Sequence, residues 1–433
     1  MNTQQQLAEK YHVSLCHRME RNAAYAEALA AGRSIPAPVT AGGVSAGQYY
    51  CGNGNSESVC RGVTEAEYAE YLRVLEADGY RTVRENRIGK NAFLTLKKGG
   101  TFLAVSYFPN YSRLQTVFSE NPDFLPPDIP AGDGHATPCM IQPGRRGAAG
   151  AAPGMSYLFR LADGSWIVID GGPWQEDDAQ DLLRLMRDGG DGKPVISLWM
   201  FSHYHGDHIG LACEFLKRYG DAVDLRAVAY NFPNAETLQL TREPFEPGWM
   251  TCLPDLITER FPGARRWNFH SGEKLSLPGA EIEILFTHED NFPVEMQWGN
   301  DTSSAWTVTQ NGKKYLFPGD CDPIQCQFLA DNYGGSLKCD VLQLTHHGFN
   351  GATEQFYRLA DPDICLWACD RMRFEKDGRC LGISAKSNDH GYSYTEPIQP
   401  LTVWEDYRFN RWLRDDSVKK RIHHHAEEEI RIP

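Results

Sequence analysis

Hydrophobic residues recur with a helical period between Thr64 and Gly79. Four of them share one face of the expected helix: Tyr68, Tyr71, Leu72 and Leu75. Thr64 and Glu67 form a capping-box pattern at its start, and Gly79 is a suitable residue at which to end it. The pattern therefore predicts a helix over this stretch.

After this stretch the pattern becomes that of strands. The runs 91–98 (NAFLTLKK) and 101–108 (TFLAVSYF) flank Gly99 and Gly100, which predicts a β-hairpin. Residues 1–45 join an Ala-rich amphipathic stretch to one containing Pro and Gly, so we expect a helix and a linker there. Together these elements predict a small N-terminal α+β domain, without a recognisable group of catalytic residues.

Pro and Gly crowd residues 121–154 and interrupt regular elements there. We place a linker at 126–136, between predicted domains at 1–125 and 137–433. In the second domain strand-like runs outnumber helical stretches, and several of these runs end in chemically reactive residues. This layout favours an α/β fold in which sheets pack on each other, helices lie outside, and loops at one edge carry the function.

Composition and charge narrow the class of protein. The 433 residues are 41% hydrophobic and 23% charged, and 43 Lys and Arg against 57 Asp and Glu give a net charge of −14. These values are typical of a globular protein. No apolar run approaches the roughly 18 residues of a membrane-spanning helix, and the start of the chain is polar, so we expect a cytoplasmic protein without membrane contact. The negative charge disfavours nucleic acid as a partner, although a local basic groove is compatible with it.

The strongest chemical signal follows the apolar run 196–201 (ISLWMF). His203, His205, Asp207 and His208 fall within six residues there. Imidazole and carboxylate are common metal ligands. Several buried imidazoles without partners would each cost a few kcal/mol. The cluster therefore indicates a metal site rather than a group of ordinary polar residues.

This H-x-H-x-D-H pattern resembles the signature of the metallo-β-lactamase-fold hydrolases. One segment before this pattern and two after it resemble further motifs of that superfamily, in the expected order. They are 167–172 (IVIDGG), 316–320 (LFPGD) and 344–348 (LTHHG). The resemblance covers roughly residues 137–433. It implies an αββα sandwich and a centre of two divalent metal ions.

In one place the chain departs from the pattern of this family. Many relatives have a His in a Gly-His-Thr setting as third ligand to the first metal, where this chain has NDTSS at residues 300–304. With the double His, this form resembles the ComEC-like branch, which contains the hydrolase-like domain of DNA-uptake competence proteins and the phosphocholine esterases. Asn300 or Asp301 would then substitute for the ligand, or the first site holds fewer protein ligands. His288 is a third candidate, although we interpret it more simply as a solvated loop residue.

The resemblance also assigns metal ligands. His203 and His205 would hold the first ion, and Asp207 and His208 the second. Asp320 would bridge the two ions, and Asp207 would also orient the attacking water. The ligand set suits Zn²⁺, and the carboxylates would also accept Mn²⁺ or Fe²⁺.

The double His is assigned less directly. The family's His-x-Gly pattern, rather than any geometric argument, favours His346 as the remaining ligand of the second ion. His347 would then act as a general acid or as a donor to an oxyanion. Asp170 is expected to hydrogen-bond a ligand His rather than to touch metal.

Two divalent cations can clamp the attacking and leaving oxygens and bring the pKa of a bound water down to about 7. The resemblance to the ComEC-like branch therefore implies a hydrolase with a small-molecule or phosphoester substrate, most simply a phosphodiester or related phosphoester. Arg371, Arg373 and Lys386 could neutralise an anionic substrate, although surface charge is their simpler interpretation. Three alternatives remain open: hydrolysis of a thioester, lactone or β-lactam, a diiron oxidoreductase, and a non-catalytic regulatory protein.

Overall fold

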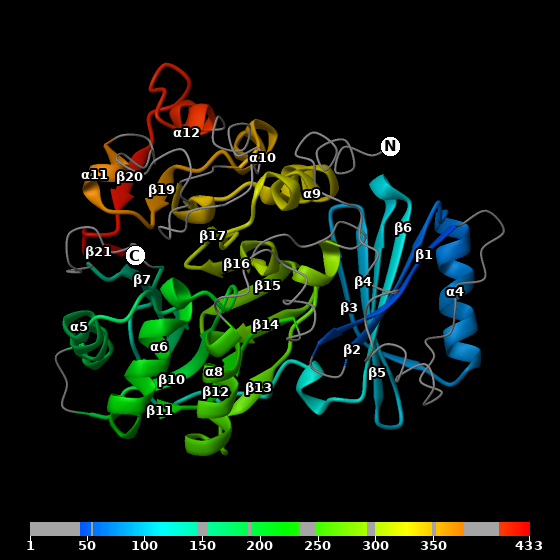
Figure 1. Ribbon diagram of the computed structural model, residues 1–433, viewed down its shortest axis with the longest axis horizontal. Helices are drawn as coiled ribbons and strands as arrows, with labels where there is room; N and C mark the ends of the chain where they lie inside the picture. The colour runs from blue at the N-terminus through cyan, green and yellow to red at the C-terminus, as the bar shows by residue number, and fades with distance from the viewer. Residues whose placement is uncertain are drawn as a thin grey trace, which may run out of the picture.

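The computed structural model describes residues 44–52, 55–144, 155–188, 192–233, 247–291, 299–348, 352–375 and 407–433. Its strands form three sheets (Figure 1). The helix and linker expected over residues 1–45 fall almost entirely outside the described residues, which begin at Val44. No helix in the described parts of the chain is both long and apolar enough to cross a membrane.

The first sheet, here called the N-terminal sheet, is antiparallel and has the order β1-β2-β6-β5-β4-β3. Its strands are β1 (Val44–Gly52), β2 (Asn55–Arg61), β3 (Arg81–Ile88), β4 (Asn91–Lys98), β5 (Thr101–Phe108) and β6 (Arg113–Ser119). Strands β4 and β5 form the predicted hairpin, with Lys98 opposite Thr101. This part of the prediction is confirmed.

Helix α4 (Glu65–Ala77) lies along one face of the N-terminal sheet (Figure 1). The Thr64 hydroxyl accepts from the backbone N–H of Glu67, and the Glu67 carboxylate accepts from that of Thr64, so two otherwise unsatisfied donors are paired. The buried residues Tyr68, Tyr71 and Leu75 face the sheet. The predicted helix and its start are confirmed.

The other two sheets form a sandwich. One has the order β13-β12-β10-β9-β8-β7-β21, with β11 beside β10, and the other has the order β14-β15-β16-β17-β18-β19-β20. The strands of the first are β7 (Cys139–Gln142), β8 (Tyr157–Arg160), β9 (Trp166–Ile169), β10 (Val195–Met200), β11 (Asp224–Leu225), β12 (Ala227–Ala229), β13 (Arg265–Trp267) and β21 (Ile430–Ile432). Those of the second are β14 (Lys274–Leu277), β15 (Ala280–Phe286), β16 (Ala305–Gln310), β17 (Lys313–Phe317), β18 (Val341–Gln343), β19 (Ile364–Trp367) and β20 (Ile422–His425).

Apolar side chains fill the space between these two sheets. Phe159 of β8 contacts Tyr315 and Phe317 of β17, with ring centres 4.9 Å and 5.9 Å away. Helices α5 (Glu176–Arg187), α6 (Gly206–Tyr219) and α8 (Pro247–Arg260) pack on the outer face of the first sheet. Helices α9 (Pro323–Tyr333), α10 (Glu354–Ala360) and α12 (Tyr407–Leu413) pack on that of the second. The order of layers is helix, sheet, sheet, helix, which confirms the predicted αββα sandwich.

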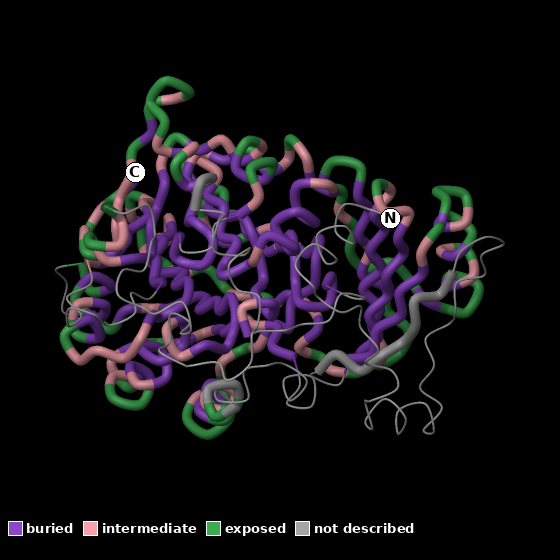
Figure 2. The backbone as a smooth tube through the Cα atoms, turned by 45° about the horizontal axis from the view of Figure 1, so that its top comes forward, coloured by how far each residue is buried: buried purple, intermediate pink, exposed green. Residues whose placement is uncertain are grey.

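The N-terminal sheet packs against the side of this sandwich, and buried backbone continues from one to the other (Figure 2). Phe93 and Phe108 of the sheet join the same hydrophobic cluster as Phe328 and Tyr333 of α9. The side-chain amide of Asn91 donates to the carbonyl of Asn332 at 2.9 Å. The two parts of the chain therefore share a core.

Gly272 is a sensitive point of this shared core. Its φ is +84°, and a Cβ added there would lie 1.9 Å from Cγ of Phe93. We expect Gly272→Ala to lower the free energy of unfolding by about 2 to 4 kcal/mol. The cost of a left-handed backbone at an alanine adds to the cost of the clash between its Cβ and Phe93. Gly312 has a φ of +75° and nothing within 4 Å of an added Cβ, so Gly312→Ala measures the strain alone. If thermal or urea unfolding shows equal losses of unfolding free energy in the two variants, the packing of Gly272 against Phe93 is contradicted.

Candidate metal centre

The candidate site residues follow strands at one edge of the sandwich. Asp170 follows β9 and His203 follows β10, and these strands are parallel. Asp320 and His346 follow β17 and β18, which are also parallel. Because the carboxyl ends of parallel strands lie at the same edge of a sheet, the fold collects these side chains in one place.

The H-x-H-x-D-H segment forms a loop and the first turn of α6. His205 lies directly before the helix, and its carbonyl accepts from the backbone N–H groups of His208 and Ile209. This change from loop to helix turns the ring of His208 back toward that of His203, with ring centres 4.0 Å apart. Asp207 also lies in the first turn of the helix. The spacing of the motif is thus explained by one tight turn.

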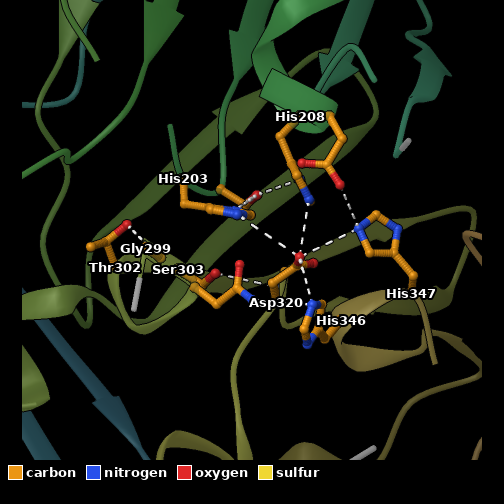
Figure 3. A network of polar contacts seen from close by, with 12 residues as sticks. His203, His208, Gly299, Thr302, Ser303, Asp320, His346 and His347 are labelled. Carbon is orange, nitrogen blue, oxygen red and sulfur yellow. Dashed lines mark hydrogen bonds and ion pairs between the residues drawn. The ribbon is translucent and has the colours of Figure 1, made fainter. Parts of the chain in front are cut away.

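Four imidazoles surround the carboxylate of Asp320 (Figure 3). Their Nε2 atoms lie at these distances from Oδ2 of Asp320: His208 at 3.2 Å, His347 at 3.4 Å, His203 at 3.9 Å and His346 at 4.0 Å. Asp320 is 1% exposed and His203 is fully buried, so these polar groups are held away from bulk water. The arrangement confirms that motifs distant in the sequence converge.

Two overlapping groups have the geometry of a metal site. One contains His203, His208 and Asp320, and the other contains Asp207, His208 and His347. In each group the ligand atoms all lie within 4.8 Å of one another. Their nitrogen and carboxylate oxygen atoms are the donors that Zn²⁺ and related ions prefer.

The double His is arranged differently from the sequence expectation. Nε2 of His347 lies 3.1 Å from Oδ2 of Asp207, and Nδ1 of His347 lies 3.0 Å from the carbonyl of Ala368. That carbonyl can only accept, so Nδ1 carries the proton and Nε2 faces the carboxylates. Nε2 of His346 instead lies 3.1 Å from the amide nitrogen of Asn300. The geometry therefore favours His347 over His346 as the metal ligand.

The backbone explains how adjacent histidines face different partners. His346 and His347 both have positive φ, at 44° and 56°. Consecutive left-handed residues are uncommon and turn the chain sharply, so the two rings leave it in different directions. The N–H of His346 donates to the carbonyl of Gly319 at 3.1 Å, which holds this turn beside Asp320.

Asp170 orients the cluster from behind. Its Oδ2 accepts from Nδ1 of His208 at 2.9 Å and from the Ser202 hydroxyl at 2.8 Å, and its Oδ1 accepts from the Ser202 backbone N–H at 2.8 Å. A protonated Nδ1 leaves Nε2 of His208 facing Asp320. This contact agrees with the role expected for Asp170.

Burial and charge shift the pKa values of the cluster in opposite directions. Burial, together with His208 and His205, holds the pKa of His203 well below its usual value, so this ring is neutral. Burial opposes the charge of Asp320, but His208 and His347 outweigh it and hold the pKa of this carboxyl well below its usual range. Burial likewise opposes protonation of His347, but the carboxylates of Asp320 and Asp207 raise its pKa to about 9.

Metal binding should therefore depend on pH. A cation bound to Nε2 of His347 must displace a proton, and with a pKa of about 9 most of these rings are protonated at neutral pH. We expect the affinity of the metal-free protein for Co²⁺ to rise between about pH 6.5 and 8.5, by up to about tenfold per pH unit for each proton displaced. Optical titration with Co²⁺ measures it, and an affinity that does not change with pH would contradict the proposed ligand.

The residues present fit divalent cations. Among the residues that the structure describes, nothing meets hydrogen-bonding geometry with Nε2 of His203 or Oδ1 of Asp320, although both atoms are buried. Orphaned buried polar atoms are costly unless an ion or water satisfies them. A pair of cations would satisfy both atoms.

The other expected ligands lie around this cluster. The ring of His205 packs against that of His203, with centres 4.6 Å apart, and a Cβ on Gly299 would lie 2.0 Å from Nε2 of His205. Asp301 accepts hydrogen bonds from Asn291 and Gln325. Neither His205 nor Asp301 belongs to the two groups described above.

His288 differs from the sequence expectation. The sequence predicts a solvated loop residue, but His288 is fully buried and its Nε2 lies 3.2 Å from Oδ1 of Asn231. The short helix η4 (His288–Asn291) carries it into the interior, which the polar sequence THED does not indicate.

Two serines contact the residues of the candidate metal centre, although the sequence analysis did not single them out. The Ser202 hydroxyl lies between Asp170 and the rings of His203 and His208. The Ser303 hydroxyl accepts from the backbone N–H of Asp320 at 3.1 Å. Their only signal in the sequence is that each adjoins a segment already identified.

The remaining candidates are structural. Trp166, Trp199 and Trp306 are almost fully buried, as are Cys321 and Cys326, whereas Trp174 is only partly buried. Arg371 pairs with Glu375 on the surface and Arg373 with Asp370. Lys386 lies outside the described residues.

Comparison with known families agrees with this geometry. Residues 149–363 match the family model described as the metallo-beta-lactamase superfamily. The match and the αββα layers show a metallo-β-lactamase fold, and they support placing this part of the chain in that superfamily. A comparison with curated proteins gives no match.

Solved structures of low identity are also similar. CmlA, a diiron β-hydroxylase from Streptomyces venezuelae, is 14% identical over 71% of this chain and 55% of its own, with a TM-score of 0.39. YhfI from Bacillus subtilis, a metallo-beta-lactamase fold protein, is 15% identical over 53% of this chain and 85% of its own, with a TM-score of 0.34. Zn²⁺-bound PqqB from Methylobacterium extorquens is 12% identical over 70% of this chain and 98% of its own, with a TM-score of 0.33. This chain thus spans about half the length of CmlA.

Proposed function

We propose that this protein is a metal-dependent hydrolase that acts on a phosphodiester or a related phosphoester. The observation that carries the proposal is the convergence of four imidazoles around Asp320, at the loop edge of a metallo-β-lactamase fold (Figure 3). The Asp207 carboxylate joins this cluster through His347. A purely structural zinc site is usually closed by four Cys or His ligands, whereas this cluster includes two carboxylates.

Within this proposal the ligands divide between two ions. His203, with His205 beside it, would hold one, and Asp207, His208 and His347 the other. Asp320 would bridge them, since its Oδ2 faces the nitrogen atoms of both groups. Two divalent cations held there, of which Zn²⁺ is the first choice, would supply hydroxide at neutral pH and neutralise charge on the substrate.

His346 is then available for proton transfer. Its side chain is about 10% exposed, the most accessible of the four rings, and its Nε2 lies beside the Asn300 amide at the edge of the cluster. We assign His346 as the general acid that protonates the leaving oxygen, with the transferred proton on its Nε2. Nε2 accepts from the Asn300 amide nitrogen when the ring is neutral, and once Nε2 is protonated the Asn300 side chain would present its Oδ1 to it instead. Asp207 orients the attacking water through its carboxylate.

The phosphoester assignment has narrower support. Residues 300–304 correspond to the stretch in which many proteins of the family that this chain resembles have a further His, and Asn300 of this stretch contacts His346. The absence of that His argues for a phosphoester rather than a thioester, lactone or β-lactam. Fewer protein ligands leave more of each cation open to the oxygens of a phosphoryl group. The acidic net charge favours a small phosphoester over a nucleic acid.

Metal removal and a substrate panel test the proposal together. The wild-type protein is assayed on chromogenic phosphodiesters, phosphomonoesters, thioesters and lactones, before and after chelation. We expect turnover of a phosphodiester that chelation abolishes and Zn²⁺ or Mn²⁺ restores. Bound metal without turnover of any compound would favour the regulatory alternative, and turnover confined to thioesters or lactones would overturn the phosphoester assignment.

A further inference from the structure

Arg113 begins β6 of the N-terminal sheet and is buried where that sheet meets the sandwich, with 2% of its surface exposed. Its Nη1 donates to the backbone carbonyl of Asp290 at 2.8 Å, and its Nη2 donates to Oε1 of Gln115 at 2.6 Å. Its guanidinium also lies 5.6 Å from the ring centre of Phe328 on α9. Nε of Arg113 is buried and has no hydrogen-bond partner among the described residues, so the bonds to Asp290 and Gln115 are the ones that fix the guanidinium. Burying a guanidinium is costly where its donors are left unpaired, so these two bonds matter to its position.

The carbonyl that accepts from Arg113 belongs to η4, which is itself held on several sides. The Asp290 carboxylate accepts from the backbone N–H of Thr287 at 2.9 Å and from the Ser271 hydroxyl. The next residue, Asn291, donates through its amide to the carbonyl of Asp301 at 2.5 Å. The short helix η5 (Gly299–Thr302) is thereby attached to η4.

Helix η5 reaches the candidate metal centre directly. The Asn300 amide contacts Nε2 of His346 at 3.1 Å, and the Asn300 carbonyl accepts from the backbone N–H of Ser303 at 2.9 Å. The Ser303 hydroxyl accepts from the backbone N–H of Asp320. Hydrogen bonds joined by the backbone of η4 and η5 therefore connect Arg113 to Asp320.

We propose that Arg113 is a positioning residue for the metal centre: by fixing η4 it fixes η5, and η5 holds Asn300 against His346 and Ser303 against Asp320. The N-terminal sheet, which adds no ligand to the two groups described, thus contributes to the geometry of the site. This inference rests on the proposed function, because it concerns the same centre. Coupling of this kind travels through contiguous hydrogen-bonded contacts.

The test compares Arg113→Met with Asn91→Ser in the full-length chain. Met keeps the apolar length of Arg but removes its donors. Asn91→Ser removes a different buried hydrogen bond between the same sheet and the sandwich, to the carbonyl of Asn332. Affinity for Co²⁺ is measured by visible absorption, with thermal unfolding, kcat and KM recorded for both variants.

We expect Arg113→Met to weaken Co²⁺ binding by up to about tenfold and to lower kcat by up to about tenfold with KM within about twofold, the range typical of residues that act on a site through intermediate contacts. Asn91→Ser should lower the melting temperature to a similar extent but leave the Co²⁺ spectrum and affinity as in wild type. Arg113→Lys, which retains one donor for the Asp290 carbonyl, should recover most of the affinity.

Equal Co²⁺ affinity and spectrum in wild type and Arg113→Met would overturn this inference and leave the proposed function standing. If Arg113→Met does not fold, Asn291→Ala removes the next hydrogen bond of the series and must produce the same weakening of Co²⁺ binding. A wild-type affinity in Asn291→Ala would overturn the inference. Failure of the wild-type protein to bind Co²⁺ would instead overturn the proposed function and this inference with it.

Discussion

Asp320→Asn is expected to remove bound metal and to lower kcat/KM by about 10²- to 10³-fold or more, on the order of the loss seen when a main charge-stabilising group is removed. The asparagine keeps the size of the side chain but not its charge. Asp320 is the group on which all four imidazoles converge. Without its negative charge, two cations held close together would repel each other with little compensation.

Asp322→Asn is the matched control for this variant. Asp322 lies two residues further along, is also an aspartate of the loop after β17, and caps α9 by accepting from the backbone N–H of Ile324 at 2.7 Å. Asparagine serves equally well as an N-cap residue. Burial and the nearby Asp301 hold the pKa of Asp322 well above its usual value, whereas the pKa of Asp320 is held well below it, so the negative charge is favoured at Asp320 and disfavoured at Asp322. Comparable metal loss in both variants would show that the loop, rather than the charge of Asp320, is responsible.

Substituting the two adjacent histidines one at a time should show which of them is the metal ligand and which is the general acid. We expect His347→Ala to lose at least one equivalent of metal and to be nearly inactive, because Nε2 of His347 faces both Asp207 and Asp320. His346→Ala should keep its metal but lower kcat by about 10²- to 10⁴-fold, the usual contribution of a general acid. Its rate should also lose the basic limb of the pH profile, and it should recover with substrates whose leaving groups need no protonation.

The opposite pattern is equally informative. Metal loss in His346→Ala with retention in His347→Ala would restore the assignment that the sequence pattern favoured. Elemental analysis and pH–rate profiles of the two purified variants provide the measurement, and their melting temperatures show whether either substitution disturbs the fold.

Much of the fold follows from local patterns. The capping box at Thr64 and the hairpin around Gly99 and Gly100 depend on neighbouring residues alone, and both are as predicted. The convergence of His203 and Asp320 also follows from sequence, because each ends a β-strand within a recognised motif. Contacts between neighbours in the chain, or between recognised motifs, are therefore the predictable part.

The rest depends on partners far apart in the chain. The orientation of His347 is fixed by the carbonyl of Ala368, which lies at the end of β19, and by a left-handed backbone that no residue type there indicates. Asp301 contacts Gln325 across the loop, so a carboxylate expected as a substitute ligand has another partner. The contact of Arg113 with Asp290 spans 177 residues and joins parts of the chain that share no motif.

Anomalous X-ray diffraction at the zinc edge, from crystals grown with Zn²⁺, is the most direct test of the metal centre. We expect two peaks within coordination distance, about 2.0 to 2.2 Å, of ligand atoms. One should contact Nε2 of His203 and the other should contact Asp207, His208 and His347, with Asp320 between them. Absence of anomalous density among these residues, with zinc bound elsewhere or not at all, would contradict the account.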